Sequence, residues 1–270
     1  MNKDTGERWF LMGDIHGEIE PIDHFYWKNR DHLTADASKN HIILLGDVGV
    51  NYALEGNRDF KFKRALSRYP FTYICLRGNH ESRVQNVMDM CPAQWQIMEK
   101  YGGKIYVEED FPQIEYLEDG PAVYEFCGYK TFSIPGAYSV DKWYRIVHDL
   151  AWFADEQLSE EEMELGRQIK AREKHFDLVI SHTCPSIYQP GDRFIAGLDQ
   201  SLVDHTMERY LGEIEYDLDY KRWAWGHFHA DRLYPWNDGK QMLMLFHDRP
   251  VDLRKFMEMK KQDSLKDIVV

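Results

Sequence analysis

The chain has 270 residues, of which 43% are hydrophobic and 29% charged, as in a globular protein with a substantial buried core. Its formal net charge of −13 disfavours binding to duplex DNA and to anionic membrane surfaces. Because the sequence has no apolar run of membrane-span length, no signal-peptide core near residues 1–8 and no paired cysteine motif, we expect a cytoplasmic protein with reduced thiols and no membrane association.

The first part of the chain predicts strands that alternate with helices. Short apolar runs, each followed closely by glycine, predict strands at residues 9–12, 41–45 and 71–76. Helices are predicted at residues 18–30, with Pro21 in the first turn, and at 60–69. This rhythm indicates an α/β fold with parallel strands, in which ligands bind beyond the carboxyl ends of the strands.

The rest of the chain predicts a different mixture of elements. Residues 104–134 alternate as short strands with turns at Asp119-Gly120 and Cys127-Gly128, and Ser159 with Glu162 forms a capping box for a helix that ends near Glu173. Further helices are predicted at 140–153 and 199–211, and further strands at 177–180, 221–225, 232–235 and 241–246. We expect one catalytic domain over residues 1–250 and a charged helical tail over 251–270.

Five short polar strings follow apolar runs and carry side chains that can bind metals. They are Gly13-Asp14-Ile15-His16-Gly17, Gly46-Asp47-Val48-Gly49, Arg77-Gly78-Asn79-His80-Glu81, Ser181-His182-Thr183 and Gly226-His227-Phe228-His229. In an extended backbone, two residues separated by one position point to the same side, as needed for chelation. A single Asp or His after a strand is more often a cap, turn or core residue, but five such strings together are hard to explain in that way.

The candidate ligands form a mixed set of nitrogen and oxygen donors without a thiolate. The set is Asp14, His16, Asp47, Asn79, His182, His227 and His229. Such donors suit first-row divalent cations. We expect two divalent ions, with Mn²⁺ first and Fe, Zn or Ni as alternatives. Nearby, Arg77 offers a planar fork that matches phosphate oxygens, and His80 can donate a proton.

In this order the five strings resemble the calcineurin-like metallophosphoesterase superfamily. Its pattern is GD-x-H, then GD, then GNH followed by Asp or Glu, then a histidine-containing turn, then GH-x-H, and the match runs from Asp14 to His229. The resemblance implies a four-layer αββα sandwich, in which two mixed sheets face each other and helices flank them. It also implies that His80 lies beside the substrate, as proton donor to the leaving group or as transition-state stabiliser.

The resemblance further implies a division of the ligands between two metal ions. One ion would take Asp14, His16 and His229; the other would take Asn79, His182 and His227; Asp47 would bridge them. A metal-bridging hydroxide would then attack the phosphorus atom.

The motifs point to two different branches of this superfamily. Residues 76–83 (LRGNHESR) resemble the protein Ser/Thr phosphatases, in which the arginine holds phosphate, but Val50 and Asn51 stand where that branch has Asp and a second Arg. The pair His227 and His229 is more similar to the phosphodiesterase branches. We favour a phosphomonoesterase in which Asp47, His80 and Arg77 are catalytic; the alternatives are a phosphodiesterase or dinucleotide polyphosphate hydrolase, and a catalytically silent metal-binding scaffold.

Residues 135–145 (PGAYSVDKWYR) resemble a segment of small bacterial and phage members of the superfamily. Lys142 and Arg145 in this segment could replace the missing phosphate-binding arginine, or they could form a solvated helix face. The expected substrate-binding set is therefore Arg77, Asn79, His80, Lys142 and Arg145. The expected partner is a phosphorylated small molecule, nucleotide or phosphoprotein, and the oligomeric state stays open.

Overall fold

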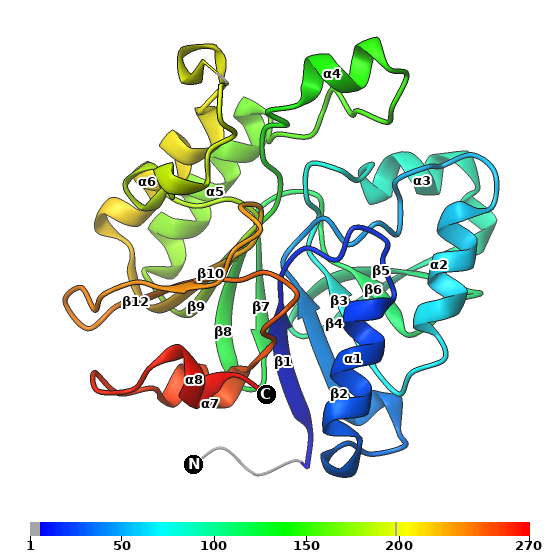
Figure 1. Cartoon of the computed structure of the whole chain (residues 1–270), viewed down its shortest axis with the longest axis horizontal. Helices are drawn as coiled ribbons and strands as arrows, with labels where there is room; N and C mark the ends of the chain where they lie inside the picture. The colour runs from blue at the N-terminus through cyan, green and yellow to red at the C-terminus, as the bar shows by residue number, and fades with distance from the viewer. Residues whose placement is uncertain (1–5, 198) are drawn as a thin grey trace.

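The computed structural model of the chain describes residues 6–197 and 199–270. Two β-sheets stand face to face, and helices cover their outer surfaces (Figure 1). The first sheet contains β1 (Arg8–Met12), β2 (Asn40–Leu44), β3 (Thr72–Cys75), β4 (Trp95–Lys100), β5 (Gly103–Glu108), β6 (Ile114–Tyr116) and β13 (Val251–Asp252), in the order β13-β1-β2-β3-β6-β5-β4. The second sheet contains β7 (Ala122–Phe126), β8 (Tyr129–Ile134), β9 (His175–Ser181), β10 (Asp219–Trp225), β11 (Arg232–Leu233) and β12 (Gln241–Met244), in the order β11-β12-β10-β9-β8-β7.

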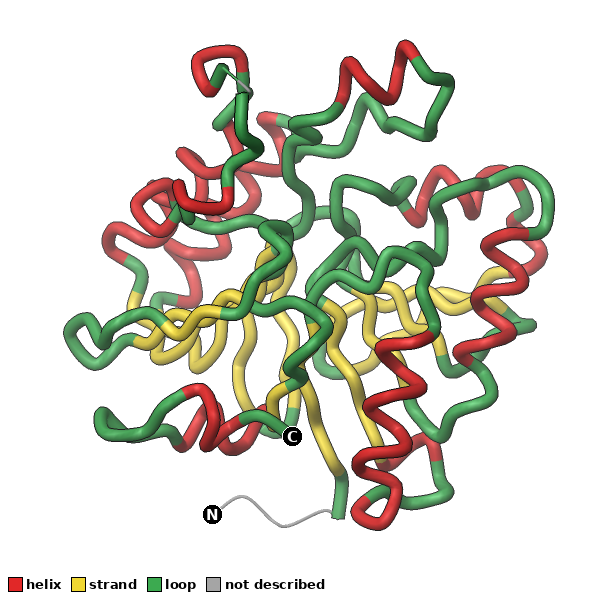
Figure 2. The backbone as a smooth tube through the Cα atoms, viewed as in Figure 1, coloured by secondary structure: helices red, strands yellow, loops and turns green. Residues whose placement is uncertain are grey.

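Both sheets are mixed, and each has a parallel centre. Strands β1, β2, β3 and β6 run parallel in the first sheet, and β8, β9, β10 and β12 run parallel in the second. Because parallel strands end at the same edge, the turns after β1, β2, β3, β9 and β10 meet at one end of the sandwich. In Figure 2 the loops gather at that end, above the strands.

Alternating side chains along the strands build three separate layers of core. Leu11, Ile43 and Ile74 pack between the sheets, against Ile180 and Leu243 of the second sheet. The neighbouring positions on β1 to β3 point outward and pack beneath α1 (Glu20–Asn29), α2 (Arg58–Leu66) and α3 (Val84–Met90). A third cluster joins the second sheet to α5 (Glu160–Glu173) and α6 (Thr206–Asp217). The four-layer αββα sandwich implied by the resemblance is therefore confirmed.

Several predicted elements are confirmed and others are wrong in extent. Ser159 and Glu162 form the predicted capping box at the start of α5. The predicted helix over 140–153 is only α4 (Lys142–Val147). The helix predicted at 199–211 begins at Thr206 instead, because Asp199 accepts a bond from the Ser201 amide in an isolated 3₁₀ turn. Neither α3 nor β4 was predicted.

The chain after Pro250 contributes to the sheet and core. It forms β13, which pairs with β1, and two short helices, α7 (Leu253–Glu258) and α8 (Leu265–Ile268), rather than one helix. Leu253 and Phe256 are fully buried between the sheets, and Figure 1 shows this segment beside β1. A domain boundary at residue 250 stays a prediction. Among the described residues no helix is both long and apolar enough to cross a membrane.

Candidate metal centre

Four of the seven predicted ligands lie in backbone conformations that side chains rarely adopt. His16, Asp47, His227 and His229 have φ angles of 47°, 49°, 68° and 49°. The extended backbone predicted for Asp14-x-His16 is therefore wrong; a tight turn brings His16 inward, and its amide donates to the carbonyl of Asp47 at 2.8 Å. Left-handed conformations at non-glycine residues gather at functional sites, where the surrounding structure imposes them.

Two glycines of the motifs let the turns approach each other closely. Gly46 has a φ of +96°, and a Cβ atom there would collide with the imidazole ring of His182. A Cβ atom on Gly78 would collide with the carboxylate and amide of Asp47. Glu81 braces the same turns, because its carboxylate accepts from the amides of Gly49 at 2.8 Å and Gly78 at 3.2 Å. Larger residues at either glycine would push the donors apart.

Asp14, His16 and His229 form the first group of donors. The ligand atoms of these three residues all lie within 4.8 Å of one another, and the Nε2 atoms of His16 and His229 are 2.8 Å apart. The carboxylate of Asp14 is fixed by the amide of His227, which donates to both of its oxygens at 2.9 and 3.0 Å. The turns after β1 and β10 thus build this group together.

Asn79, His182 and His227 form the second group. The Nδ1 atom of His182 lies 2.7 Å from the carbonyl oxygen of Leu45, so in the neutral ring Nδ1 carries the proton and Nε2 is bare. That bare Nε2 atom lies 2.9 Å from Oδ1 of Asn79, which is also 3.1 Å from Nδ1 of His227. Two acceptors that face each other without a proton repel, and a bound cation removes that repulsion.

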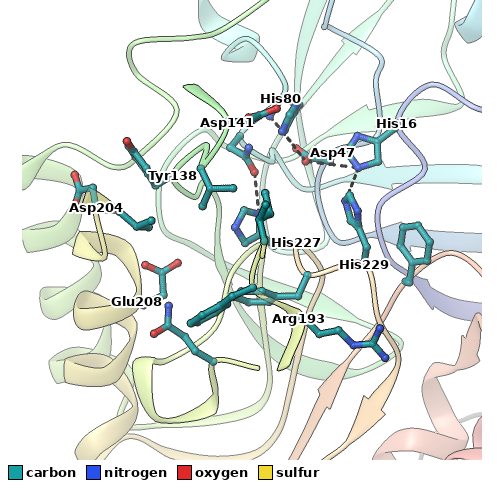
Figure 3. Close-up of a pocket in the computed structure, with 18 of the residues that line it drawn as sticks. His16, Asp47, His80, Tyr138, Asp141, Arg193, Asp204, Glu208, His227 and His229 are labelled. Atoms are coloured by element: carbon teal, nitrogen blue, oxygen red, sulfur yellow. Dashed lines mark hydrogen bonds and ion pairs between the residues drawn. The ribbon is translucent and has the colours of Figure 1, made fainter. Parts of the chain in front are cut away.

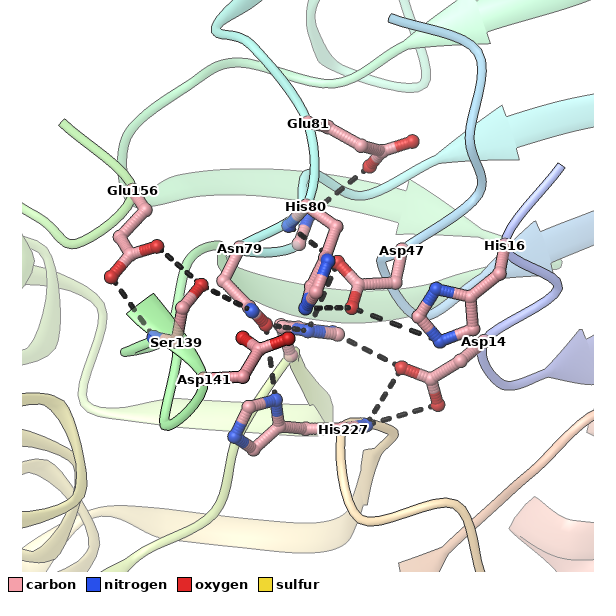
Figure 4. A network of polar contacts seen from close by, with 12 residues as sticks. Asp14, His16, Asp47, Asn79, His80, Glu81, Ser139, Asp141, Glu156 and His227 are labelled. Atoms are coloured by element: carbon pink, nitrogen blue, oxygen red, sulfur yellow. Dashed lines mark hydrogen bonds and ion pairs between the residues drawn. The ribbon is translucent and has the colours of Figure 1, made fainter. Parts of the chain in front are cut away.

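Asp47 lies between the two groups (Figure 4). Its Oδ1 atom is 3.5 Å from Nε2 of His182, and its Oδ2 atom is 4.0 Å from Nε2 of His16. The structure therefore brings all seven predicted ligands together, while their division between two ions stays a prediction. Imidazole, carboxylate and amide donors that converge in this way fit first-row divalent cations.

Burial and mutual attraction shift the titration of these groups strongly. Burial raises the pKa of Asp14 to about 7 and lowers the pKa of His16 to about 4. Burial opposes the charge on Asp47 and on His182, but their attraction overcomes it: the pKa of His182 rises to about 9, and the pKa of Asp47 falls well below its usual value. Without a cation, a protonated His182 balances the carboxylate of Asp47.

His80 and Arg145 stand together beside this cluster. The Nε2 atom of His80 is 3.9 Å from Oδ2 of Asp47 and 3.5 Å from an Nη atom of Arg145. Burial lowers the pKa of His80, which favours its neutral form. Asp141 accepts from Nε of Arg145 at 2.8 Å, and the Tyr52 hydroxyl accepts from Nη1 at 3.3 Å, so the guanidinium is held next to the imidazole.

Arg77 and Lys142 are placed away from the donors. The Arg77 guanidinium is buried and donates to the carbonyl of Glu156 at 2.8 Å and to that of Asp119 at 3.3 Å, and it lies 3.5 Å from the Asp119 carboxylate. The Lys142 ammonium lies 4.3 Å from the centre of the Trp152 ring. Neither residue lines the cavity above the cluster, whereas Arg145 does. Their placement favours structural contacts over a phosphate contact.

A cavity of about 500 Å³ lies above the cluster, and sequence reasoning missed its opposite wall. That wall includes Gln189, Arg193, Phe194, Asp204 and Glu208 (Figure 3). Figure 3 shows Asp204 and Glu208 on the α6 side, with His16, Asp47 and His229 on the other side. These residues come from loops and the start of a helix without a recognisable motif, so no pattern in the sequence marks them.

The family model described as calcineurin-like phosphoesterase matches residues 8–231, which include all seven donors. No curated protein matches the sequence. Among solved structures, a dimetal phosphatase from Danio rerio is 10% identical, with 93% of each chain covered and a TM-score of 0.48. The phosphopantetheinyl hydrolase of Mycobacterium tuberculosis is 15% identical, with 98% of this chain and 95% of that chain covered and a TM-score of 0.45.

The family match spans most of the chain, and the cluster offers side chains that could hold the metal ions of this family's chemistry. The chain therefore belongs to the calcineurin-like phosphoesterase family, whose members are metal-dependent phosphoester hydrolases.

Proposed function

We propose that the chain hydrolyses phosphoesters at a centre of two divalent cations. Asp14, His16 and His229 would hold one cation, Asn79, His182 and His227 the other, and Asp47 would bridge them. The observation that carries this proposal is the convergence of imidazole nitrogens on two sides of the Asp47 carboxylate. When bound, two such cations lower the pKa of a coordinated water and neutralise phosphoryl charge. Mn²⁺ is the first candidate, and Fe, Zn or Ni are alternatives.

Two side chains are proposed to act directly on the substrate. Arg145 binds a non-bridging phosphate oxygen, because its guanidinium lines the cavity beside the cluster. His80 directs its ring N–H at the leaving oxygen and stabilises the charge that develops there. Arg145 thus takes the role that the LRGNHESR motif suggested for Arg77, whose guanidinium is held by backbone carbonyls.

A phosphomonoester is the substrate class we favour. The pair Arg145 and His80 places a cation and an N–H donor side by side, which suits the terminal phosphate of a monoester. The cavity of about 500 Å³ and its second wall favour the alternative, because they leave room for the second substituent of a diester or dinucleotide polyphosphate. The candidate partners are accordingly a small phosphorylated molecule, a nucleotide or a phosphoprotein.

Hydrolysis of p-nitrophenyl phosphate and bis-p-nitrophenyl phosphate with added Mn²⁺ tests this proposal. We expect preference for the monoester, lost in Arg145→Ala and retained in Arg77→Ala when corrected for the folded fraction. Preference for the diester, with Arg145→Ala unchanged, would support the alternative. If the protein binds Mn²⁺ but turns over neither compound, a catalytically silent scaffold would replace the enzyme hypothesis.

A further inference from the structure

We propose that Ser139 and Glu156 are positioning residues that hold the amide of Asn79 with its oxygen toward the metal centre. This inference rests on the proposed function, because it takes Asn79 as a metal ligand. Sequence reasoning had singled out neither Ser139 nor Glu156.

A chain of three buried side chains carries the inference (Figure 4). The Nδ2 atom of Asn79 donates to Oγ of Ser139 at 2.9 Å, and Oγ of Ser139 donates to Oε2 of Glu156 at 2.5 Å. The amide of Ser139 donates to Oε1 of Glu156 at 2.9 Å, so both carboxylate oxygens are used. Asn79, Ser139 and Glu156 are 2%, 1% and 2% exposed, so water can hardly replace the hydrogen bonds among them.

The carboxylate sets the direction of every hydrogen bond in this chain. An ionised Glu156 can only accept, so the Ser139 hydroxyl must donate to it. The lone pairs of the Ser139 oxygen are then left for the N–H of Asn79. If the Asn79 amide were rotated by half a turn, its oxygen would meet the Ser139 oxygen as a second acceptor. The pair therefore selects one of the two amide orientations, which are almost identical in shape.

Without Ser139 and Glu156, neutral rings of His182 and His227 on the other side of Asn79 would favour the opposite orientation of its amide. The oxygen Oδ1 of Asn79 lies 2.9 Å from Nε2 of His182 and 3.1 Å from Nδ1 of His227. A rotated amide would donate its N–H groups to these ring nitrogens and would present no oxygen to a metal. Ser139 and Glu156 oppose that rotation and keep a metal-type donor in the centre.

Two arginines of the LRGNHESR motif hold the segment that carries Glu156. Arg77 donates to the carbonyl of Glu156 at 2.8 Å. Arg83 donates to the carbonyls on either side, that of Asp155 at 3.0 Å and that of Gln157 at 2.9 Å. The motif therefore supplies Asn79 itself together with the anchors of the segment that orients it.

Calorimetric titration of the full chain with Mn²⁺ tests the inference by a readout other than turnover. We expect Glu156→Gln and Ser139→Ala to weaken one of two Mn²⁺ equivalents by about tenfold or more, as for other outer residues that orient metal ligands, and to leave the other unchanged. Ser139→Thr, which keeps the hydroxyl, should bind closer to wild type than Ser139→Ala. Glu115→Gln is the matched control, since Glu115 on β6 is a buried carboxylate paired with Lys100 on β4.

A double variant separates orientation of the amide from general structural support. In Asn79→Asp both terminal atoms are oxygens, so no orientation has to be selected. We expect Glu156→Gln to change Mn²⁺ affinity in the Asn79→Asp background by less than about threefold, against about tenfold or more in wild type. The inference is overturned if Glu156→Gln weakens Mn²⁺ binding equally in both backgrounds, or if it leaves the wild-type affinity unchanged. Two Mn²⁺ ions bound to the wild type would still support the proposed function in either case. If wild type bound no Mn²⁺, both would fail. Thermal melts check that each variant is folded. If Glu156→Gln does not fold, Ser139→Ala is compared in the wild-type and Asn79→Asp backgrounds in its place.

Discussion

The Nε2 atoms of His16 and His229 lie 2.8 Å apart, although the two residues come from different sheets. Two nitrogens that bind one cation at about 2.1 Å each are about 3 Å apart when they meet at a right angle. Partial burial among the other donors lowers the pKa of both rings and so favours the unprotonated form that binds a metal. The first sheet and the second sheet are thus linked through a contact between two proposed ligands.

Removal of the metal should therefore lower the thermal stability of the whole domain. A cation at about 100 times its Kd stabilises the folded state by about 2.7 kcal/mol per site, which corresponds to a shift of roughly 5–10 °C in Tm for a chain of this size. Thermal melts with Mn²⁺ and with EDTA measure this shift. His229→Ala should reduce the shift and leave the melt in EDTA unchanged, since His229 is exposed. An undiminished shift in His229→Ala would contradict its role as a ligand.

Metal affinity should rise with pH because His182 must lose a proton to bind a cation. Its pKa of about 9 without metal means that the proton is still bound at pH 7 and must be displaced. Between pH 7 and 8.5 we expect the Mn²⁺ affinity to rise by about tenfold per pH unit for one displaced proton. Below pH 7 the rise should be steeper, because Asp14, with a pKa of about 7, then also carries a proton.

Titration calorimetry in two buffers of different ionisation enthalpy checks the proton count directly. Release of about one proton per cation at pH 7.5 is the expected result. His182→Ala should bind Mn²⁺ more weakly and release no such proton on binding. A pH-independent affinity between 7 and 8.5 would show that His182 is already neutral in the protein without metal.

The meeting of the seven proposed ligands could be predicted from the sequence because each of them closely follows a strand. Parallel strands end at one edge, so residues far apart in the chain, such as Asp14 and His227, meet without any knowledge of the loops. The apolar runs indicated an α/β fold with parallel strands, whereas the two facing sheets were implied only by the family resemblance. The predicted backbone conformation was wrong, because left-handed turns, and not extended backbone, direct His16 and His229 toward the cluster.

The direction of Arg77 could not be predicted from its place in a motif. Arg77 directly follows a strand end, like the ligands, but its partners Asp119 and Glu156 lie 42 and 79 residues further along the chain. Ser139 and Glu156 were missed for the same reason: their role depends on a contact between loops, and neither residue type indicates a metal centre by itself. The start of α6 was misplaced because two Asp-capped turns precede it.

Arg77 and Arg145 should differ in what their loss does to the protein. Arg77→Met removes the cation beside the largely buried Asp119 carboxylate, which then keeps only the amides of Val84 and Gln85, and it removes the donor to the Glu156 carbonyl. We therefore expect a loss of about 3 kcal/mol in the free energy of unfolding. Arg145→Met should leave this free energy within about 0.5 kcal/mol and lower kcat/KM by about 100-fold or more. Urea denaturation and steady-state kinetics on both variants measure these quantities. A stable Arg77→Met with lost phosphate binding would restore the role suggested by the motif.

Loss of the His80 side chain should matter more as the leaving group becomes poorer. The imidazole lies beside Asp47 and Arg145, and the backbone amide of His80, which donates to Asp47 at 2.9 Å, is kept in any substitution. If His80 stabilises the leaving oxygen, His80→Gln should slow hydrolysis of phenyl phosphate by about 100-fold or more, and that of p-nitrophenyl phosphate much less, because p-nitrophenolate departs readily without help.

Mn²⁺ titration of His80→Gln provides the control for this comparison. The ring nitrogen of His80 is also close enough to His16 and Asp47 to share a cation with them. If His80 served as a metal ligand, His80→Gln would weaken Mn²⁺ binding and slow both substrates equally. We expect unchanged Mn²⁺ affinity and unequal slowing, because the seven other donors already complete both groups and the imidazole of His80 then faces the cavity where the leaving group lies.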